Sequence, residues 1–375
     1  MKKQTFPKQK AHFSKTLNTV PLLDKEIQKI SLLAKPLGYS KLSFLSRGKR
    51  GYIFLADYNK KKVCIKSKNP NSKVNTLLNE YNFLKRLKDY NLCPLPIKNH
   101  QSFISMQFIE GLPFERFLET YIEKDLKTKI IHIIWQLIDQ MLLLDLLGIN
   151  KQEMTHPAKH ILITQRNITQ GNITQRNNEK NKEFHPILID FERARFSKNP
   201  KNLTQFISYL NSKKISSLLI KKDILINSQT LMIQVKKYKR IIKTDNNFSQ
   251  GLSNISSLKE ISIEIKKNIW LNPSNFSEKV LSKTILIPKG KVTSYGHIAK
   301  ELNTKAFRAV GVVLSKNQFA PVVPCHRVVC SNGFIGGFNG GYEKSNIKEK
   351  LLKSEGIKIY KLKDKSVVPK RYFLE

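Results

Sequence analysis

The strongest constraint on this chain is the six-residue string Pro-Cys-His-Arg-Val-Val at residues 324–329. A cysteine thiol is mostly protonated near neutral pH, and an imidazole beside it can accept its proton. Cys325 and His326 supply both groups in adjacent positions. A Cys-His dipeptide alone is weak evidence for a reactive thiol, so the interpretation depends on the segments around it.

Those segments predict two short helices and a glycine-rich loop. Residues 287–302 predict a turn that leads into an amphipathic helix, and residues 306–317 predict a second helix with small side chains. Two helices joined by a short turn are typical of a helix-turn-helix motif that binds DNA. Residues 333–341 predict a loop that shapes the floor of a pocket, and residues 348–356 predict a closing helix.

In the order and spacing of these motifs, residues 276–357 resemble the O6-alkylguanine-DNA alkyltransferases, the methylated-DNA-protein-cysteine methyltransferase family. The resemblance implies a mostly helical, winged-helix-like domain that binds duplex DNA and flips an O6-alkylguanine out of the base stack. It also implies that the alkyl group moves irreversibly to a cysteine, without any cofactor or metal. One molecule then repairs one lesion.

The resemblance assigns roles to individual residues. Cys325 is the implied alkyl acceptor, His326 deprotonates it through a water, and Glu355 orients His326. Tyr295 donates toward guanine N3, and Arg308 fills the space that the flipped base leaves. The implied DNA-binding residues are Tyr295, Arg308, Ala309, Gly311 and the hinge residue Asn317, and the implied base-pocket residues are Val328, Phe338 and Asn339.

Some positions depart from the family pattern or allow another interpretation. Phe338 stands where many members have Tyr, Asn339 replaces a smaller residue, and about three extra residues precede Glu355. Cys330 could join Cys325 and His326 in a metal site, but no fourth ligand is near, so we expect a buried apolar role for Cys330. A DNA-lesion sensor without alkyl transfer is the competing function.

The N-terminal half contains a different set of charged residues. Lys66 ends an apolar strand, and Glu80 follows inside a predicted amphipathic helix over residues 75–87. A strand lysine paired with a helix acid holds nucleotide phosphates in kinases. Asp190 follows a short buried strand and is placed like a magnesium ligand, while Gly48 and Gly51 could cap the phosphates.

Residues 32–210 resemble the small archaeal atypical protein kinases of the RIO type, which implies a bilobal domain that uses ATP and Mg²⁺. Glu153 stands near the place of the catalytic-loop Asp, and His160 near that of the Asn metal ligand. Their spacing is two residues longer than usual, and Glu192 follows Phe191 where the family has Gly. A serine/threonine kinase regulated by a DNA-binding module, a pseudokinase and a nucleotide-binding scaffold all stay open.

Charge and composition agree with a protein that binds nucleic acid. The chain has 375 residues with 67 Lys and Arg against 28 Asp and Glu, a formal net charge of +39. Because 55 of the basic residues are Lys, a compositional bias of the genome also explains part of this excess. Four cysteines are too few for a disulfide scaffold, and no apolar stretch predicts a membrane span. We expect a monomer in the cytoplasm that associates with the nucleoid when bound to DNA.

The predicted architecture is α+β with two domains. Its segments are a basic tail at 1–30, a kinase-like domain at 31–212 with a low-complexity insertion at 163–177, a basic extension and linker at 213–271, the alkyltransferase domain at 272–360, and a basic tail at 361–375. The preferred size of the alkyl group, the kinase substrate and any communication between the domains are not predicted.

Overall fold

The computed structural model describes residues 21–48, 50–69, 71–121, 126–167, 182–244, 253–362 and 365–374. The chain divides into two compact units, which we describe separately. The first unit contains Met1–Lys124 and Ile133–Ile215, and the second contains Asp125–His132 and Ser216–Glu375. The mixture of helices and strands agrees with the predicted α+β class.

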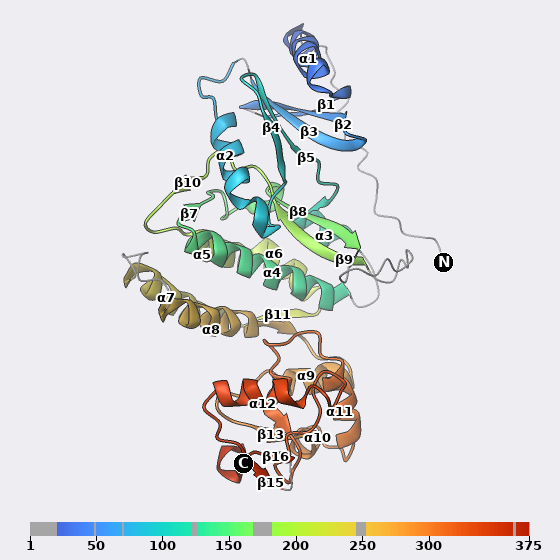
Figure 1. The fold of residues 1–375 in the computed structure, drawn as a ribbon, viewed down its shortest axis with the longest axis vertical. Coiled ribbons are helices and arrows are strands. Elements are labelled where there is room, and N and C mark those ends of the chain that lie inside the picture. Colours follow the sequence, from blue (N-terminus) through green and yellow to red (C-terminus); the bar gives the residue numbers. More distant parts are fainter. Residues whose placement is uncertain are drawn as a thin grey trace, which may run out of the picture. The chain divides into compact units, whose positions relative to one another are not determined.

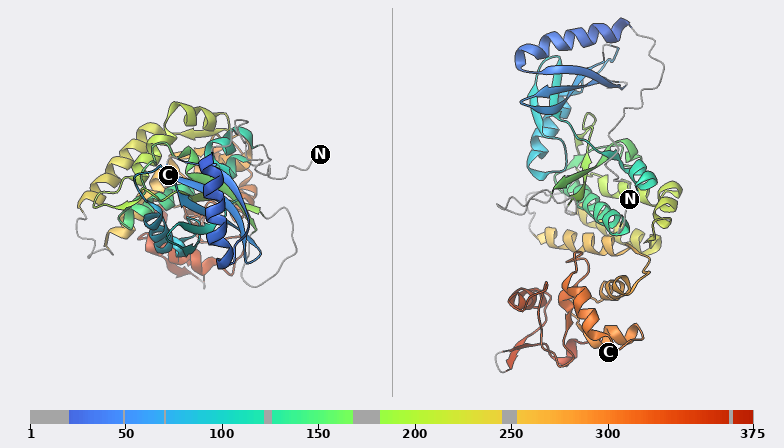
Figure 2. Two further views of the ribbon diagram at one scale, coloured as in Figure 1. Left: turned by 90° about the horizontal axis from the view of Figure 1, so that it is seen from above. Right: turned by 90° about the vertical axis from the view of Figure 1, so that its right-hand side faces the viewer.

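An antiparallel five-stranded sheet in the order β1-β2-β3-β5-β4 begins the first unit (Figure 1). Alternate residues of its second strand, among them Tyr52, Phe54 and Ala56, are fully buried, as expected for a sheet with one covered face. Helix α1 packs on that face through Ile30 and Ala34 (Figure 2). The strands are β1 Ser40–Arg47, β2 Gly51–Tyr58, β3 Lys61–Lys68, β4 Pro96–Asn99 and β5 Phe103–Gln107.

Two predictions about this region need correction. The predicted basic tail at 1–30 ends in a helix, because α1 spans Pro21–Ala34 and buries Ile30. The predicted helix over 75–87 is present as α2, Leu77–Leu87. Helical spacing predicted a buried stripe of Leu77, Leu78, Tyr81, Leu84 and Leu87. In the structure Leu78 is 55% exposed, and Phe83 lies in the core.

The rest of the first unit is mainly helical around a three-stranded sheet, β6-β8-β9. The first copy of the Ile-Thr-Gln-Arg-Asn repeat, predicted to lie in a surface loop, instead forms most of strand β8 and pairs with β9. Residues 168–177 of the predicted insertion lie outside the described residues. The elements are β6 Leu112–Pro113, α3 Phe114–Thr120, α4 Leu126–Leu146, β7 Ile149–Asn150, β8 Ile161–Asn167, β9 Lys182–Leu188, β10 Arg195–Phe196, α5 Asn202–Leu210 and α6 Lys213–Ile220. The start of α4 and the end of α6 are counted with the second unit.

Helix α4 carries the most apolar segment of the sequence. Most of its Ile, Leu and Met side chains are buried. Among the described residues, no helix combines the length and the apolar character that a membrane crossing requires.

The second unit begins with the predicted extension and linker, which is largely helical. Strands β11 and β12 pair as antiparallel neighbours, with α7 and α8 between them in sequence. Residues 253–257 of the predicted polar linker belong to α8. The elements are β11 Ile224–Ile226, α7 Ser228–Thr244, α8 Ser253–Lys267 and β12 Ile269–Leu271.

Four short helices and a parallel strand pair follow. Helices α10 and α11 form the predicted helix-turn-helix, and α10 begins where the Ser294 hydroxyl accepts a hydrogen bond from the His297 amide at 3.0 Å. The elements are α9 Phe276–Thr284, β13 Thr293–Ser294, α10 Tyr295–Glu301, α11 Phe307–Ser315, β14 Val328–Val329 and α12 Ser345–Ser354.

The predicted basic tail at 361–375 is part of the folded core. Strands β15, Tyr360–Leu362, and β16, Lys365–Val367, form a hairpin. Val368 is buried in one cluster with Val292, Ile335 and Leu352. The last residues therefore complete the second unit instead of extending from it.

Candidate functional site

Cys325 lines a cavity of about 190 Å³ in the second unit. The thiol residue opens a short 3-10 turn, Cys325–Arg327, and is only 6% exposed. The cavity lies between the helix-turn-helix and the glycine-rich loop. Its lining residues are Tyr295, Gly311, Leu314, Ser315, Cys325, Gly337, Phe338, Asn339, Gly340, Gly341, Tyr342 and Lys348.

The glycine-rich loop forms one wall through a tight turn. Phe338 and Gly341 exchange backbone hydrogen bonds of 2.9 and 3.0 Å across the two residues between them. Asn339 has φ 47°, a left-handed conformation that Asn tolerates better than most residues. Phe338 and Asn339, two of the predicted base-pocket residues, both line this cavity. Val328 lies behind the cavity, with its side chain fully buried.

His326 is held by Glu355, which the sequence predicted as its partner. His326 Nε2 lies 2.8 Å from Glu355 Oε1. Hydrogen bonds from His326 and Arg327 lower the pKa of the Glu355 carboxyl to about 2, although burial acts in the opposite direction and is the largest single effect. Glu355 is therefore ionised at neutral pH, so Nε2 carries the proton and Nδ1 can accept one.

Arg327 is a residue of this site that sequence reasoning missed. Its guanidinium donates to both carboxylate oxygens of Glu355, at 2.7 Å from Nη2 and 2.9 Å from Nε, and to the Ile287 carbonyl at 2.6 Å. A planar guanidinium that binds a carboxylate through two nitrogens fixes its orientation. Arg327 thus fixes Glu355, and Glu355 in turn orients His326.

Lys348 is the second missed residue. The side chain is almost fully buried, and Nζ donates to the Val328 carbonyl at 2.6 Å. It also lies 3.4 Å from the Tyr295 hydroxyl. Burial lowers the pKa of Lys348 to about 8, while the nearby Cys325 acts in the opposite direction. A cation is therefore present at neutral pH beside the reactive thiol.

The Cys325 thiol has opposing influences on its ionisation. Burial raises its pKa, whereas a hydrogen bond with Asn317 and the charge of Lys348 lower it. Asn317 is itself fixed, because its side chain donates to the Val323 carbonyl at 2.9 Å and accepts from the Phe319 amide at 3.0 Å. The predicted hinge residue therefore also contacts the predicted nucleophile.

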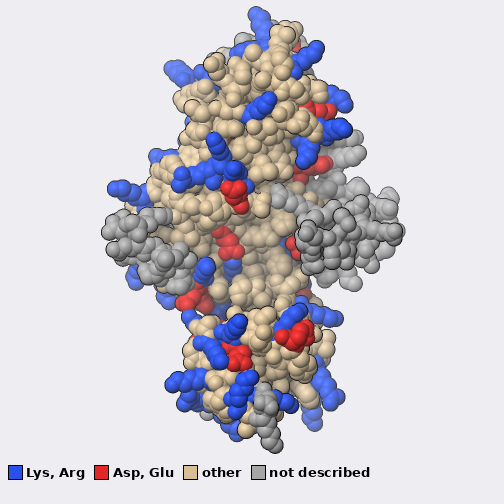
Figure 3. Space-filling view, in the orientation of Figure 1, with Lys and Arg blue, Asp and Glu red and all other residues tan. Residues whose placement is uncertain are grey.

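The predicted DNA-contacting residues lie on the helix-turn-helix. Burial raises the pKa of Tyr295 to about 12, so its phenol keeps its proton. Gly311 faces the Tyr295 ring, and Ala309 is half-buried. Arg308 is exposed in the first turn of α11. On the face drawn in Figure 3, Lys and Arg side chains are more frequent than Asp and Glu on this unit.

Cys330 is half-buried and lines a second cavity of about 390 Å³ with Phe334, Gly336 and Glu349. It was predicted to be a buried apolar residue, so this expectation needs correction, because Cys330 is partly exposed to the second cavity. The clusters of potential metal ligands found among the described residues lie in the first unit.

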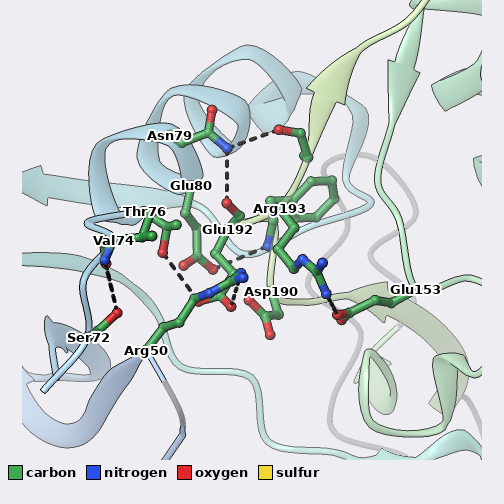
Figure 4. Close-up of polar contacts among 12 residues, drawn as sticks. Arg50, Ser72, Val74, Thr76, Asn79, Glu80, Glu153, Asp190, Glu192 and Arg193 are labelled. Atoms are coloured by element: carbon green, nitrogen blue, oxygen red, sulfur yellow. Dashed lines mark hydrogen bonds and ion pairs between the residues drawn. The ribbon is translucent and has the colours of Figure 1, made fainter.

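In the first unit, Lys66 and Glu80 form the predicted strand-to-helix ion pair, 2.7 Å long. Lys66 Nζ also lies 3.1 Å from Asp190 and 3.2 Å from Glu192. Figure 4 shows the carboxylate of Glu80, from α2, near those of Asp190 and Glu192, which share the segment after β9. These acids raise the pKa of Lys66, which stays charged despite its burial. The structure thus brings together residues that are up to 126 positions apart in sequence.

The remaining predicted residues of this unit lie close by. His160 Nε2 is 3.0 Å from Glu153, and its Nδ1 is 3.6 Å from Asp190. The Gly48 amide donates to the Gly51 carbonyl at 2.8 Å, which closes a turn before β2. A Cβ at Gly51 would lie 2.7 Å from the Ser67 carbonyl oxygen, so only glycine fits there.

Sequence comparison finds a family match in the second unit, the unit that contains Cys325. Residues 275–357 match the family model described as 6-O-methylguanine DNA methyltransferase, DNA binding domain. Methylated-DNA-protein-cysteine methyltransferases from Methanocaldococcus vulcanius and Sulfolobus acidocaldarius are 50% and 43% identical to this chain over 85 and 86 residues. These alignments cover 23% of this chain and 50% and 52% of those proteins. The chain therefore spans about half the length of the curated relatives that it matches.

The solved structures to which the chain is similar include two complexes with DNA. S. pombe Atl1 in complex with damaged DNA containing O6-carboxymethylguanine is 28% identical, with 27% of this chain and 94% of that chain covered and a TM-score of 0.25. Mycobacterium tuberculosis OGT in complex with DNA is 36% identical, with 22% and 52% covered and a TM-score of 0.20. The family match confirms the resemblance predicted for the C-terminal region. The resemblance of the first unit to kinases stays a prediction.

Proposed function

We propose that the C-terminal region repairs duplex DNA by transferring the alkyl group of an O6-alkylguanine irreversibly to Cys325. The observation that carries this proposal is a buried thiol at the end of a cavity whose walls come from a helix-turn-helix and a glycine-rich loop. The match of residues 275–357 to the 6-O-methylguanine DNA methyltransferase model supports it.

The chemistry follows from the hydrogen bonds of the site. His326 Nδ1 accepts the thiol proton through a water, because Glu355 holds the proton on Nε2. The sulfur then attacks the alkyl carbon, so that an S–C bond forms while the C–O6 bond breaks and its electron pair stays on guanine. A proton donated from Tyr295 toward guanine N3 neutralises that charge. The Lys348 cation, 3.4 Å from the Tyr295 oxygen, stabilises the resulting phenolate.

The target base must leave the stack before this reaction. Guanine O6 in paired DNA is out of reach of a thiol that is 6% exposed. Arg308, exposed at the start of α11, is long enough to enter the vacated space and always charged. Unstacking costs a few kcal/mol, and the inserted guanidinium recovers part of that free energy.

The test uses the covalent product. The full chain is incubated with duplex DNA that contains O6-methylguanine, and intact and peptide masses are measured. We expect a gain of one methyl group on the peptide with Cys325, lost in Cys325→Ala and kept in the matched control Cys330→Ala. If the lesion is bound without any gain in mass, the region is a damage sensor and the transfer proposal is wrong.

We propose a second, separate function for the first unit, the binding of ATP with a divalent ion. The buried Lys66–Glu80 pair beside Asp190 favours it, since a lysine held in this way can contact nucleotide phosphates. Asp190 would hold the ion next to those phosphates. A protein serine/threonine kinase that DNA regulates is the more specific form of this proposal, and a nucleotide-binding scaffold is the less specific one.

A fluorescent ATP analogue tests this second function. We expect saturable binding that Lys66→Met weakens at least about tenfold, the loss of one buried charged contact. Lys62→Met is the matched control, because Lys62 lies on the same strand and pairs with Asp57 at the surface. Equal binding by both variants would contradict the proposal. ATP hydrolysis measured with and without DNA then separates a DNA-regulated kinase from a scaffold.

A further inference from the structure

A cavity of about 440 Å³ lies in the first unit between α2 and β10. This volume is typical of ligand sites, which range over about 300–1,000 Å³. None of the residues proposed to bind ATP or a divalent ion is among those that line it. The lining side chains from α2 are Asn79, Asn82, Phe83 and Arg86, and those from β10 are Arg195 and Phe196.

Hydrogen bonds fix the two walls of this cavity relative to each other. The four residues of α2 recur at the i, i+3, i+4 and i+7 spacing of one helix face. The Asn79 side-chain amide donates to the carbonyls of Glu192 at 3.1 Å and Ala194 at 3.0 Å, the two dashed lines that leave Asn79 in Figure 4. These bonds hold the chain that leads into β10 against α2, so the shape of the cavity is set by the fold.

The two arginines of the cavity have no acidic partner in the part of the chain that the structure describes. Arg86 and Arg195 are both exposed, and no Asp or Glu side chain lines the cavity. Arg193, on the same segment, pairs by contrast with Glu153 at 2.7 Å. A guanidinium can bind two phosphate oxygens at once. A ligand with phosphate groups therefore complements the charge of this cavity.

Beside these charges lies an exposed aromatic ring. Phe196 is 61% exposed, although the Phe83 ring centre lies 5.3 Å from its own and the Arg86 guanidinium carbon lies 5.2 Å from it. The two neighbours hold the ring in place and still leave most of the side chain open to solvent. Nucleobases stack on aromatic rings and on guanidinium planes, and both surfaces are present here.

Asn82 adds a group that can contact the edge of a base. Its side chain is exposed, and its carboxamide offers both hydrogen-bond donors and an acceptor, as base edges do. In a duplex, neighbouring base pairs already cover both faces of each base. An aromatic ring that stacks a base, next to arginines that bind phosphates, is therefore suited to a single strand.

We propose that the cavity between α2 and β10 binds a nucleotide of a single-stranded nucleic acid. The base stacks on Phe196, Asn82 contacts the edge of the base, and Arg86 and Arg195 pair with the phosphates on the strand. This function is separate from alkyl transfer and from ATP binding, because it uses none of the residues proposed for either.

The test is photochemical cross-linking of the full chain to a short single-stranded oligothymidine that contains one 5-iodouracil. This base cross-links preferentially to aromatic side chains that stack on it, and peptide masses identify the linked residue. We expect the product on the peptide with Phe196, and its loss in Phe196→Leu, which keeps an apolar contact with Phe83. The same sequence in a duplex should give much less of this product, because its bases are already stacked.

The yield of this product against oligonucleotide concentration gives the affinity of the site. Arg195→Gln should weaken it about fivefold or more, the effect of losing one hydrogen-bonded charge. It should also reduce the slope of log affinity against log salt by about 0.7, the value for one phosphate contact of a single strand. Arg47→Gln is the matched control, since Arg47 lies over the Tyr52 ring on the same unit but does not line the cavity.

Several outcomes would overturn the proposal. Cross-links only on other peptides, equal affinity in Arg195→Gln and Arg47→Gln, or an equal yield from the duplex would each do so. Displacement by ATP with Mg²⁺ would instead make the cavity a site for a free nucleotide, and displacement by a phosphotyrosine peptide would make it a phosphopeptide site. Because the assay contains neither ATP nor O6-methylguanine, a failure of the two activities proposed above does not affect its result.

Discussion

Lys348 shows how a single buried charge can control the reactive residue. Its ammonium lies under the Cys325 cavity, and its charge favours the Cys325 thiolate. We predict that Lys348→Met, a neutral side chain of similar length, slows methyl transfer at least about tenfold, the effect of removing one electrostatic stabiliser. The pH dependence of iodoacetamide alkylation should also show a higher pKa for Cys325.

The pKa measurement separates an electrostatic role from a structural one. Lys353→Met, a substitution in the same helix of a lysine paired with Glu349 at the surface, is the control and should leave both quantities unchanged. If Lys348→Met slowed transfer without moving the pKa of Cys325, the lysine would act through Tyr295 or through packing and not on the thiol.

Glu355 links the proposed base His326 to the stability of the second unit. The folded-state pKa of Glu355 is about 2 and the ordinary value is 4.5, so its contribution is complete above pH 4.5 and is lost as the pH falls toward 2. The shift corresponds to about 3 kcal/mol. We predict that Glu355→Gln removes a similar amount of unfolding free energy at pH 7 and flattens its decline between pH 4.5 and 2. Calorimetry of the unfolding transition of the second unit measures the unfolding free energy and its dependence on pH. If this free energy declined below pH 4.5 in Glu355→Gln as it does in the unmodified chain, the role of Glu355 would be contradicted.

The motif predicted Cys325, His326 and Glu355, and the structure pairs two of them, with His326 Nε2 2.8 Å from Glu355 Oε1. Arg327 and Lys348 were missed for a physical reason. In a chain with 55 lysines, a basic residue is by default a solvated one, and no spacing rule marks a lysine whose ammonium turns inward to a carbonyl. Only the backbone of the surrounding loops creates that environment.

At the scale of elements, the hairpin β15–β16 differs most from its prediction. Lysines surround Val367 and Val368, so charge suggested a tail, whereas burial of the two valines decides the structure. The Val368 amide donates to the Gly333 carbonyl at 2.9 Å, and the Leu374 amide to Val292 at 2.8 Å. Local composition does not reveal such pairing, because the partners are over thirty residues away.

We therefore predict that the hairpin supports the fold of the second unit. Val368→Ala should reduce the unfolding free energy of the second unit by about 2 kcal/mol, the value for losing most of a buried valine. Gly333→Ala should also destabilise it, because φ is +88° and a Cβ would lie 2.6 Å from the Val368 carbonyl oxygen. Lys361→Ala, exposed on β15, is the control. Unchanged melting of Val368→Ala would restore the interpretation of a tail.

Helix and strand type were otherwise predictable where the periodicity was strong. The antiparallel strands before Lys66 and the helix-turn-helix followed from alternation and from helical spacing. The strand at the start of the repeat, from Ile163, could not be predicted in this way, because the repeat is polar. This strand pairs with β9. Pairing with a distant strand overrode the local preference.

For the whole molecule, the charge of +39 is explained either by DNA binding or by genome composition. These explanations differ in salt dependence, since counterion release makes affinity fall steeply as salt rises. We predict that affinity for a lesion-free duplex falls at least about tenfold between roughly 50 and 200 mM salt. Filter binding measures this affinity at each salt concentration. Arg308→Ala is compared with the matched variant Lys279→Ala, which replaces a lysine of α9. An affinity that hardly changes with salt would favour the compositional explanation.

The two proposed sites lie in separate compact units and use different residues. Lys66 contacts Glu80, Asp190 and Glu192, whereas Glu355 contacts His326 and Arg327. Sites without shared partners usually respond to mutation independently. We therefore predict that Lys66→Met weakens ATP binding at least about tenfold but changes the rate of methyl transfer less than about twofold, and that Cys325→Ala abolishes methyl transfer but leaves ATP binding unchanged.

Each variant is measured in both assays, with calorimetry to show that the other unit still melts at its normal temperature. If Lys66→Met altered methyl transfer only when ATP was present, nucleotide binding would be coupled to repair. By thermodynamic linkage, lesion-containing DNA would then have to change the affinity for ATP by the same factor. That result would favour a kinase or nucleotide switch regulated by DNA damage over two independent activities in one chain.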